Sequence, residues 1–416
     1  LTLSARRDES NLFGVATNQK GVPLWCAGIA WESSKEKLLE LSWLENLKLR
    51  ATYGYTGTVN NSISAYLTAN NFVSNDYATN YAAIINPPNP DLRWERVANL
   101  NIGLDFTVLN GRINGNLDAW RKKGIDLIGN SPIAPQTGIS IYTGNSANTL
   151  TRGIDLQLNS VNIDRAFKWK TTLLYNMANS EVTEYKVSNG TNLNVVSANY
   201  NNPLEGYPFY ALFSFRYAGL SNTGAPQGYL NGAVSENYSS IISSTDRNQL
   251  TYHGSAVPTS FGSILNSFEF SGVSLSLNIA YKFGYHFRRP SLNNVSLYST
   301  STNYQMPDYD RRWQKPGDEL QTSVPAMIYP ANVNRTNLYS YSDALVEKGD
   351  HIRLQDIRIG YSPSKKALRY FKRIEIFAYL SNLGIIWRAN KRGIDPDSPS
   401  GMPNPRTLAA GLRADL

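Results

Sequence analysis

Two neighbouring segments of this chain alternate apolar and polar residues with unusual strictness. In 97–109 apolar residues recur at every second position, opposite Asn, Asp, Gly and Thr, and after Asn110-Gly111 the alternation resumes in 112–123. A period of two is typical of a β-strand with two unlike faces. An Asn-Gly pair between two such runs is a strong signal for a β-hairpin. The chain is therefore predicted to build antiparallel sheet.

The same period recurs along the whole chain and predicts about twelve strands. No long helical period intervenes, which excludes parallel α/β folds and leaves an antiparallel all-β class. Near Asp356 the apolar parity slips by one residue, from Leu354 to Ile357, and this slip predicts a β-bulge. The predicted strands cover 1–7, 22–32, 44–57, 97–109, 112–123, 148–162, 166–180, 259–270, 273–284, 351–362, 372–383 and 407–416.

The connections between these strands fall into a short set and a long set. If each strand crosses a membrane once, every long connection lies on the same side. That is the layout of a transmembrane β-barrel with short periplasmic turns and long extracellular loops. Loops longer than about 15 residues are uncommon in compact soluble domains. The short connections are 33–43, 110–111, 163–165, 271–272 and 363–371, and the long ones are 58–94, 127–147, 183–258, 288–350 and 384–404, while 8–21 is intermediate in length.

A soluble β-sandwich or jelly roll, whose strands also alternate, is the alternative architecture. A sandwich buries one face of each sheet and has shorter strands on average. Here the second face carries Asn, Asp, Lys, Arg and Gln in strand after strand, as a wet barrel lumen requires. Aromatic residues also gather near strand ends, as in the girdles at both membrane interfaces. These residues are Trp25, Trp31, Tyr53, Tyr55, Trp169, Tyr281, Tyr285 and Tyr361.

Composition narrows the chemistry that this chain offers. Its single cysteine, Cys26, excludes an intramolecular disulfide framework and a multi-cysteine metal site. The three histidines lie far apart in sequence, and no H-E-x-x-H, G-x-S-x-G or Gly-rich phosphate motif occurs. No apolar run reaches about 18 residues, so no transmembrane helix is expected. We therefore expect neither an enzyme nor a cofactor.

Eight blocks of sequence, spread in order over nearly the whole chain, share their pattern with one protein family. They are 3–14 (LSARRDESNLFG), 44–57, 89–106 (NPDLRWERVANLNIGLDF), 110–128, 149–163, 311–325 (RRWQKPGDELQTSVP), 346–362 and 379–399. With these blocks in register, the chain resembles the C-terminal part of the SusC/RagA group of TonB-dependent outer-membrane transporters, found in Bacteroidota. Its last residue, Leu416, departs from the aromatic residue that usually ends this family.

The resemblance implies a 22-stranded barrel closed by a plug domain, in the outer membrane. Residues 1–416 are then the C-terminal part of the barrel, and the plug, the TonB box and the N-terminal strands lie outside this chain. The implied partners are the N-terminal half of the same barrel, TonB through the missing N-terminal part, a SusD-like surface lipoprotein, lipopolysaccharide and outer-membrane lipid. No nucleic-acid partner is expected.

Two functions follow from this resemblance. The first is TonB-energised import of oligomeric nutrients, glycans or peptides, through a barrel that a SusD-like lipoprotein covers as a lid. The second is a structural role, in which a SusC-like barrel serves as an interaction subunit of another outer-membrane complex. An intact TonB box favours import, and a degenerate one favours the structural role.

Four inward-facing residues near the extracellular strand ends are candidates for substrate contact: Trp120, Lys122, Lys282 and Arg353. An indole stacks on a sugar or side chain, and the cations are suited to carboxylates. The alternative is that these residues only bond the plug or neighbouring loops.

The long connections offer residues of a second kind. Arg311, Arg312 and Trp313 are expected to order their loop through charge-assisted bonds to carboxylates such as Asp308 or Asp310, with direct contact to the lid as the alternative. The Asp-rich segment 395–401 suggests a calcium loop, but it lacks the ligand spacing and the distal Glu of an EF-hand. We therefore interpret it as a Pro-stiffened extracellular turn.

Overall fold

The computed structural model divides the chain into two compact units, which are described separately below. The first comprises Leu1–Asn159, Asn176–Ser188 and Leu204–Phe209, and the second comprises Ser160–Tyr175, Asn189–Pro203 and Tyr210–Leu416. The structure describes residues 1–10, 21–35, 41–58, 65–74, 77, 79–132, 141–188, 190–197, 201–298, 306–363, 371–399 and 401–415. The last residue, Leu416, lies outside these ranges, and so does Ser400 of the Asp-rich segment 395–401.

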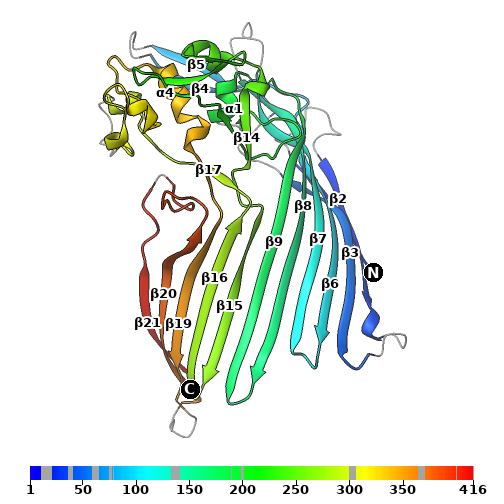
Figure 1. The fold of residues 1–416 in the computed structure, drawn as a ribbon. Coiled ribbons are helices and arrows are strands. Elements are labelled where there is room, and N and C mark those ends of the chain that lie inside the picture. The colour runs from blue at the N-terminus through cyan, green and yellow to red at the C-terminus, as the bar shows by residue number, and fades with distance from the viewer. Residues whose placement is uncertain are drawn as a thin grey trace. The chain divides into compact units, whose positions relative to one another are not determined.

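One twelve-stranded antiparallel sheet dominates the fold (Figure 1). Its strands follow one another in chain order, with only small inserted elements between them. The all-β class and all twelve predicted strands are therefore confirmed. The strands are β1 (Thr2–Glu9), β2 (Gly21–Glu32), β3 (Leu44–Thr58), β6 (Glu95–Val108), β7 (Ile113–Pro132), β8 (Ile141–Asp164), β9 (Phe167–Tyr185), β15 (Ser260–Phe270), β16 (Val273–Phe283), β19 (His351–Tyr361), β20 (Arg373–Arg388) and β21 (Thr407–Asp415).

Two local predictions are also confirmed. The β6–β7 hairpin turns through Asn110 and Gly111, whose φ angles of 56° and 73° lie in the left-handed region that Asn and Gly tolerate. Between β16 and β19, Asn278 pairs with Asp356 while Ile279 pairs with Leu354, so one residue of β19 is left over as a bulge.

The predicted bounds of two long connections are wrong. β7 continues to Pro132 and β8 begins at Ile141, so most of 127–147 is strand. β20 likewise continues to Arg388, into the predicted loop 384–404. Strict alternation is needed only where one face meets lipid; where both faces meet water, a strand continues without that pattern.

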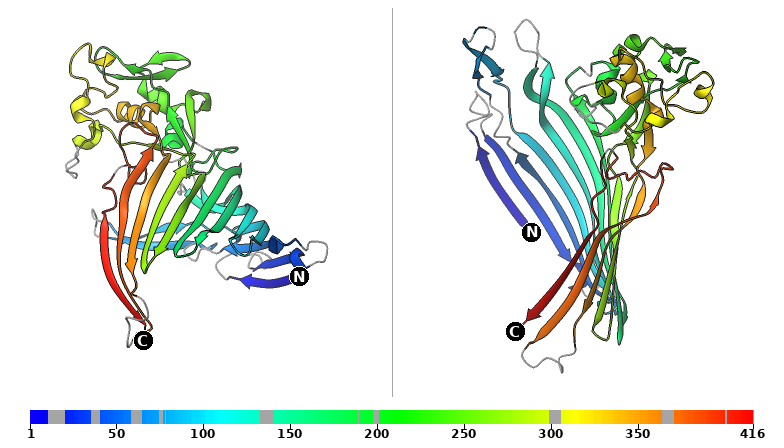
Figure 2. Two further views of the ribbon diagram at one scale, coloured as in Figure 1. Left: turned by 60° about the horizontal axis from the view of Figure 1, so that its bottom comes forward. Right: turned by 90° about the vertical axis from the view of Figure 1, so that its left-hand side faces the viewer.

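The other long connections fold into small elements of their own. In the second unit these elements gather beside one end of β15, β16 and β19 (Figure 2). Among the helices in the described ranges, none is long and apolar enough to span a membrane. The elements are β4 (Thr68–Val73), β5 (Asn80–Asn86), α1 (Asn192–Ser197), β10 (Ala211–Phe215), β11 (Gly219–Leu220), β12 (Pro226–Leu230), β13 (Ala233–Ser235), α2 (Tyr238–Ser243), β14 (Leu250–Ser255), β17 (His286–Arg288), α3 (Asn294–Leu297), α4 (Val333–Ser340) and β18 (Val346–Lys348), with single 3₁₀ turns at Ser33–Lys35, Arg247–Gln249, Tyr309–Arg311, Asp318–Leu320 and Asp343–Leu345.

The two faces of the sheet have opposite chemistry. On one face of the first unit, Leu104 of β6 pairs with Leu49 of β3 and Leu117 of β7. On the other face, Arg50 donates from Nε to Asp105 at 2.8 Å and from Nη2 to Asp118 at 3.2 Å. This ion cluster fills the space beside Gly103, where a Cβ atom would collide with the guanidinium group. Alternation thus produces an apolar outer wall and a polar inner wall.

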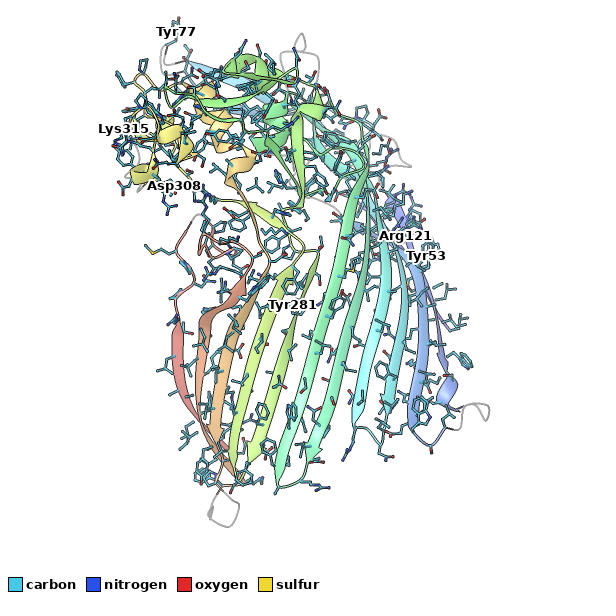
Figure 3. All side chains as sticks on the ribbon, viewed as in Figure 1. Tyr53, Tyr77, Arg121, Tyr281, Asp308 and Lys315 are labelled. Atoms are coloured by element: carbon cyan, nitrogen blue, oxygen red, sulfur yellow. The ribbon has the colours of Figure 1, made fainter. Side chains whose placement is uncertain are left out.

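Aromatic side chains form clusters on the apolar face near the strand ends. In the first unit, Trp25, Tyr53 and Tyr55 lie with ring centroids 5.6 to 5.8 Å apart. Tyr285, which we expected in this girdle, is instead buried beyond the end of β16. Figure 3 labels Tyr53 on β3 and Tyr281 on β16. The clusters of the second unit are Tyr281, Phe283 and Trp387, and at the opposite strand ends Phe167, Trp169 and Phe268.

The block NPDLRWE anchors the connection that precedes β6. Leu92 and Trp94 are 0% and 7% exposed and belong to a hydrophobic cluster with Val22 and Leu24 of β2. Asp126 of β7 receives ion pairs from Arg93 at 2.9 Å and Arg96 at 3.0 Å. The block therefore closes a small core at the end of the first unit's inner wall.

Candidate functional site

Trp120 is held in place on the inner wall of the first unit. Its Nε1 donates to Oδ2 of Asp155 at 2.7 Å, and its ring lies against the backbone of Gly153, where a Cβ atom would have no room. The ammonium group of Lys122 lies 4.7 Å from the ring centroid, within cation–π range. The structure thus brings Trp120 and Lys122 together, and a ligand that stacked on this ring would meet a positive charge beside it.

Lys282 and Arg353 come together in the second unit, where they bind the segment that follows β20. Lys282 Nζ lies 2.7 Å from Asp397 Oδ1, and Arg353 Nη2 lies 2.6 Å from Asp395 Oδ1. Both cations therefore already have carboxylate partners from a neighbouring loop. This arrangement is the one expected if the residues order loops, and any substrate carboxylate must compete with it.

His351 completes this cluster, although no pattern in the sequence pointed to it. Its Nε2 lies 3.4 Å from Asp397 Oδ2, and its Nδ1 lies 3.3 Å from the hydroxyl of Tyr285. The hydrogen bond from His351, with the nearby ammonium of Lys282, holds the pKa of Asp397 well below its usual range, although burial opposes this. Asp397 is therefore a permanent anion at neutral pH and fastens the loop to the sheet.

The segment around Arg311, Arg312 and Trp313 is ordered mainly by its own residues. Trp313 Nε1 donates to Glu319 Oε2 at 2.9 Å, and this bond lowers the pKa of Glu319. The guanidinium of Arg312 stacks on the ring of Tyr309, with its carbon 4.0 Å from the ring centroid. Nη1 of Arg312 also donates to the backbone carbonyl oxygen of Tyr309 at 3.0 Å, so among the described residues Tyr309, and not a carboxylate, is the partner of Arg312.

Asp308 has its strongest partner in a residue that we did not single out from the sequence. The side chain of Arg311 lies 3.9 Å from it, whereas Arg289 donates directly to its Oδ2, which also accepts from Ser291 at 2.8 Å. Arg289 is only 3% exposed. Asp308, labelled in Figure 3, therefore joins the buried end of β17 to the following loop. The sequence has two adjacent arginines here, Arg288 and Arg289, and no pattern in it indicated which of them would be fully buried.

Arg311 also lines a cavity of about 760 Å³ within the second unit. The cavity lies among β14, β17, β18 and the residues that follow β20, segments that are far apart in sequence. Its lining is strongly basic. The lining residues are His253, His286, Arg311, Val346, Glu347, Lys348, Ala389, Lys391 and Arg392.

The two histidines of this cavity are neutral at physiological pH. Burial, with smaller effects of His286 and Arg288, lowers the pKa of His253 to about 4, and burial also lowers the pKa of His286. His253 Nε2 lies 2.6 Å from the hydroxyl of Ser214, which is fully buried in β10. Within the described ranges, no three His, Cys, Asp or Glu side chains form a group that would hold a metal ion.

This shift predicts acid sensitivity of the β10–β14 pair. Because the pKa of His253 is lower in the folded state, protonation favours the unfolded state. The stability that neutral His253 contributes is complete above the unfolded-state pKa of about 6.5 and is lost as the pH falls toward 4. At pH 5 we expect amide exchange in β14 to rise by about tenfold beyond the intrinsic pH effect. In a His253→Gln variant this extra rise should disappear. An equal rise in both proteins would assign the sensitivity to another group.

An antiparallel sheet with an apolar outer wall, a polar inner wall and aromatic clusters at its strand ends defines an outer-membrane β-barrel protein. The family model described as "TonB dependent receptor-like, beta-barrel" matches residues 1–383. The chain belongs to this family, whose members are outer-membrane transport proteins and not enzymes.

Individual relatives agree with this assignment. TonB-dependent receptor P39 of Formosa agariphila is 25% identical over 442 residues, covering 95% of this chain and 42% of the relative. TonB-dependent receptor SusC of Bacteroides thetaiotaomicron is 24% identical over 447 residues, covering 100% of this chain and 42% of SusC. A solved structure of the RagAB peptide transporter superposes with a TM-score of 0.75 at 20% identity, covering 99% of this chain and 45% of that chain. This chain therefore spans less than half the length of these relatives.

Proposed function

We propose that this chain is the C-terminal part of a barrel that imports oligomeric nutrients across the outer membrane in a TonB-dependent manner. The family match over residues 1–383 is the observation that carries the proposal. The polar inner wall, with Trp120, Lys122 and the Arg50 cluster, supports it because a hydrated path needs such a lining. Peptides are one substrate class, since RagAB is a peptide transporter, and glycans are the other.

We infer that further strands complete the barrel. In the part of the chain that the structure describes, the sheet ends at β1 and β21, and each has one partner strand. Unpaired backbone groups in hydrocarbon cost several kcal/mol each, so an open edge is not stable in a membrane. The N-terminal strands expected from the family would pair with these edges, and the expected plug would lie inside the closed barrel.

The decisive test of import is whether growth on the imported nutrient depends on TonB. In the source bacterium, deletion of the gene for the full-length protein should abolish growth on its nutrient, and loss of TonB should have the same effect. Growth on a monomeric nutrient is the control. If disabling TonB leaves the phenotype of this protein unchanged, the structural role in another outer-membrane complex is favoured instead.

A SusD-like lipoprotein is the proposed partner of the long connections. Tyr77, in the connection before β6, is 80% exposed, and Tyr329, in the connection before β18, is 82% exposed. Tyrosine offers a large amphipathic contact area, which suits protein interfaces. Deletion of 183–258 is a poor test, because Phe213 and Phe215 in that segment are core residues.

Substitution of the exposed tyrosines is a sharper test. Tyr77→Glu and Tyr329→Glu together should reduce co-purification of the lipoprotein by about tenfold, since interface hot spots contribute about 2 kcal/mol or more. The matched Tyr→Phe pair should retain most binding, and both variants should assemble normally. Full recovery of the lipoprotein with the Glu variant would exclude these tyrosines from the interface.

A further inference from the structure

The basic cavity of the second unit has a lining that suits one chemical class of substrate. Among the described residues, its lining carries four cationic side chains, Arg311, Lys348, Lys391 and Arg392, and one carboxylate, Glu347. The two histidines add no positive charge at neutral pH, because burial lowers their pKa values. The cavity therefore has a net positive charge.

Glu347 is already neutralised by other groups. Its Oε1 lies 3.3 Å from Nε of Arg392 and 3.7 Å from Nε of the buried Arg289. Among the described residues, no carboxylate lies within ion-pair distance of Lys348 or Lys391. These two ammonium groups are thus available to an anionic ligand, and no internal pair has to break.

The walls of the cavity are fixed before any ligand arrives. Arg311, Asp308, Arg289, Glu347 and Arg392 form a chain of ion pairs that links the loop before β18, the end of β17, β18 and the segment after β20. The central member, Arg289, is buried, so its own pairs with Asp308 and Glu347 are screened less by salt than the exposed ends at Arg311 and Arg392. A preorganised site loses less entropy on binding.

A second cavity of about 470 Å³ shares Arg311 and Arg392 with the first. Its lining also contains Arg289 and Arg312, together with Asp310 and Asp318 and several amide and hydroxyl side chains. The two cavities therefore form a continuous basic surface that suits an oligomer with more than one anionic group.

The lining also indicates whether an anionic sugar or an acidic peptide fits the two cavities better. As far as the structure describes them, neither cavity is lined by Phe, Trp or Tyr, the side chains on which sugar rings stack. Guanidinium and ammonium groups instead match carboxylates, and arginine binds them with two parallel hydrogen bonds. We propose that this cavity binds the side-chain and terminal carboxylates of acidic peptides, as a specificity site of the importer proposed above.

Direct binding to the full-length protein tests this inference without depending on transport. The probe is a fluorescent heptapeptide rich in glutamate, measured by anisotropy at low salt against its glutamine counterpart. Lys348→Gln with Lys391→Gln should weaken binding of the acidic peptide by about tenfold and leave the glutamine peptide unaffected. Lys348→Arg with Lys391→Arg should restore binding, because the charge is kept.

The control variant is Lys315→Gln, at a residue that Figure 3 labels. Lys315 is an exposed cation in the connection that also contains Arg311, and it lines neither cavity. It should bind the acidic peptide like the unmodified protein. Equal weakening by Lys315→Gln, unchanged affinity in the double Gln variant, or equally tight binding of an oligogalacturonate would each overturn the inference. TonB-dependent uptake by the unmodified protein tests the import function separately. Its presence would leave that function intact in any of these cases, and its absence would refute that function whatever the result of the binding experiment.

Discussion

Replacing Leu104 with arginine should destabilise the assembled barrel by about 2–4 kcal/mol, the cost of a cation at the lipid face near the bilayer centre. Leu104 lies in the middle of β6 and is flanked by Leu49 and Leu117 on the apolar face, where no carboxylate pairs with it. The guanidinium would have to remain in hydrocarbon or distort the bilayer to reach water. Denaturant unfolding of the full-length protein in lipid vesicles measures this loss.

Asn116→Arg provides the matched control. Asn116 is next to Leu117 on β7 but faces the inner wall, where it pairs across the sheet with Asp105. An arginine there meets water and a carboxylate, so the expected change in the free energy of unfolding is below about 1 kcal/mol. Equal costs at positions 104 and 116 would show that the two faces are assigned wrongly.

A second large effect is expected at the start of β6. Trp94→Ala should cost about 3–5 kcal/mol, because it empties the cluster formed with Leu92, Val22 and Leu24. The loss should be local, since the cluster closes the connection before β6 and does not belong to the membrane-spanning wall. Hydrogen exchange should therefore rise in 65–74 and 79–94, while the middle of β6 stays protected.

Trp43→Ala is the comparison for this variant. Trp43 is 51% exposed, in the short turn before β3, so its removal should leave exchange in 65–94 unchanged. If Trp94→Ala also has no effect on exchange, the cluster does not hold the connection. If it instead abolishes assembly, the NPDLRWE block is needed to form the sheet itself.

The membrane-spanning part of the fold was predictable because its signal is local. In a strand with one face in lipid and one in water, each residue reports its own face, and the register with the next strand follows from short turns. The Asn110-Gly111 hairpin and the bulge at Asp356 were both visible in this way. The same logic fails in the extracellular segments, where water wets both faces and the continuation of β7 to Pro132 left no alternation to detect.

The sequence by itself thus determined the strands, their two faces and the kind of protein they build. Only the tertiary structure decided which charges meet. Lys282 pairs with Asp397, and Arg353 with Asp395, across long stretches of chain, so two residues expected to contact substrate also bind a neighbouring loop. The cavity around Lys348 and Lys391 likewise assembles from segments that are distant in sequence. Side-chain periodicity encodes the local face of a strand, whereas ion pairs and cavities depend on distances that arise only when the loops pack together.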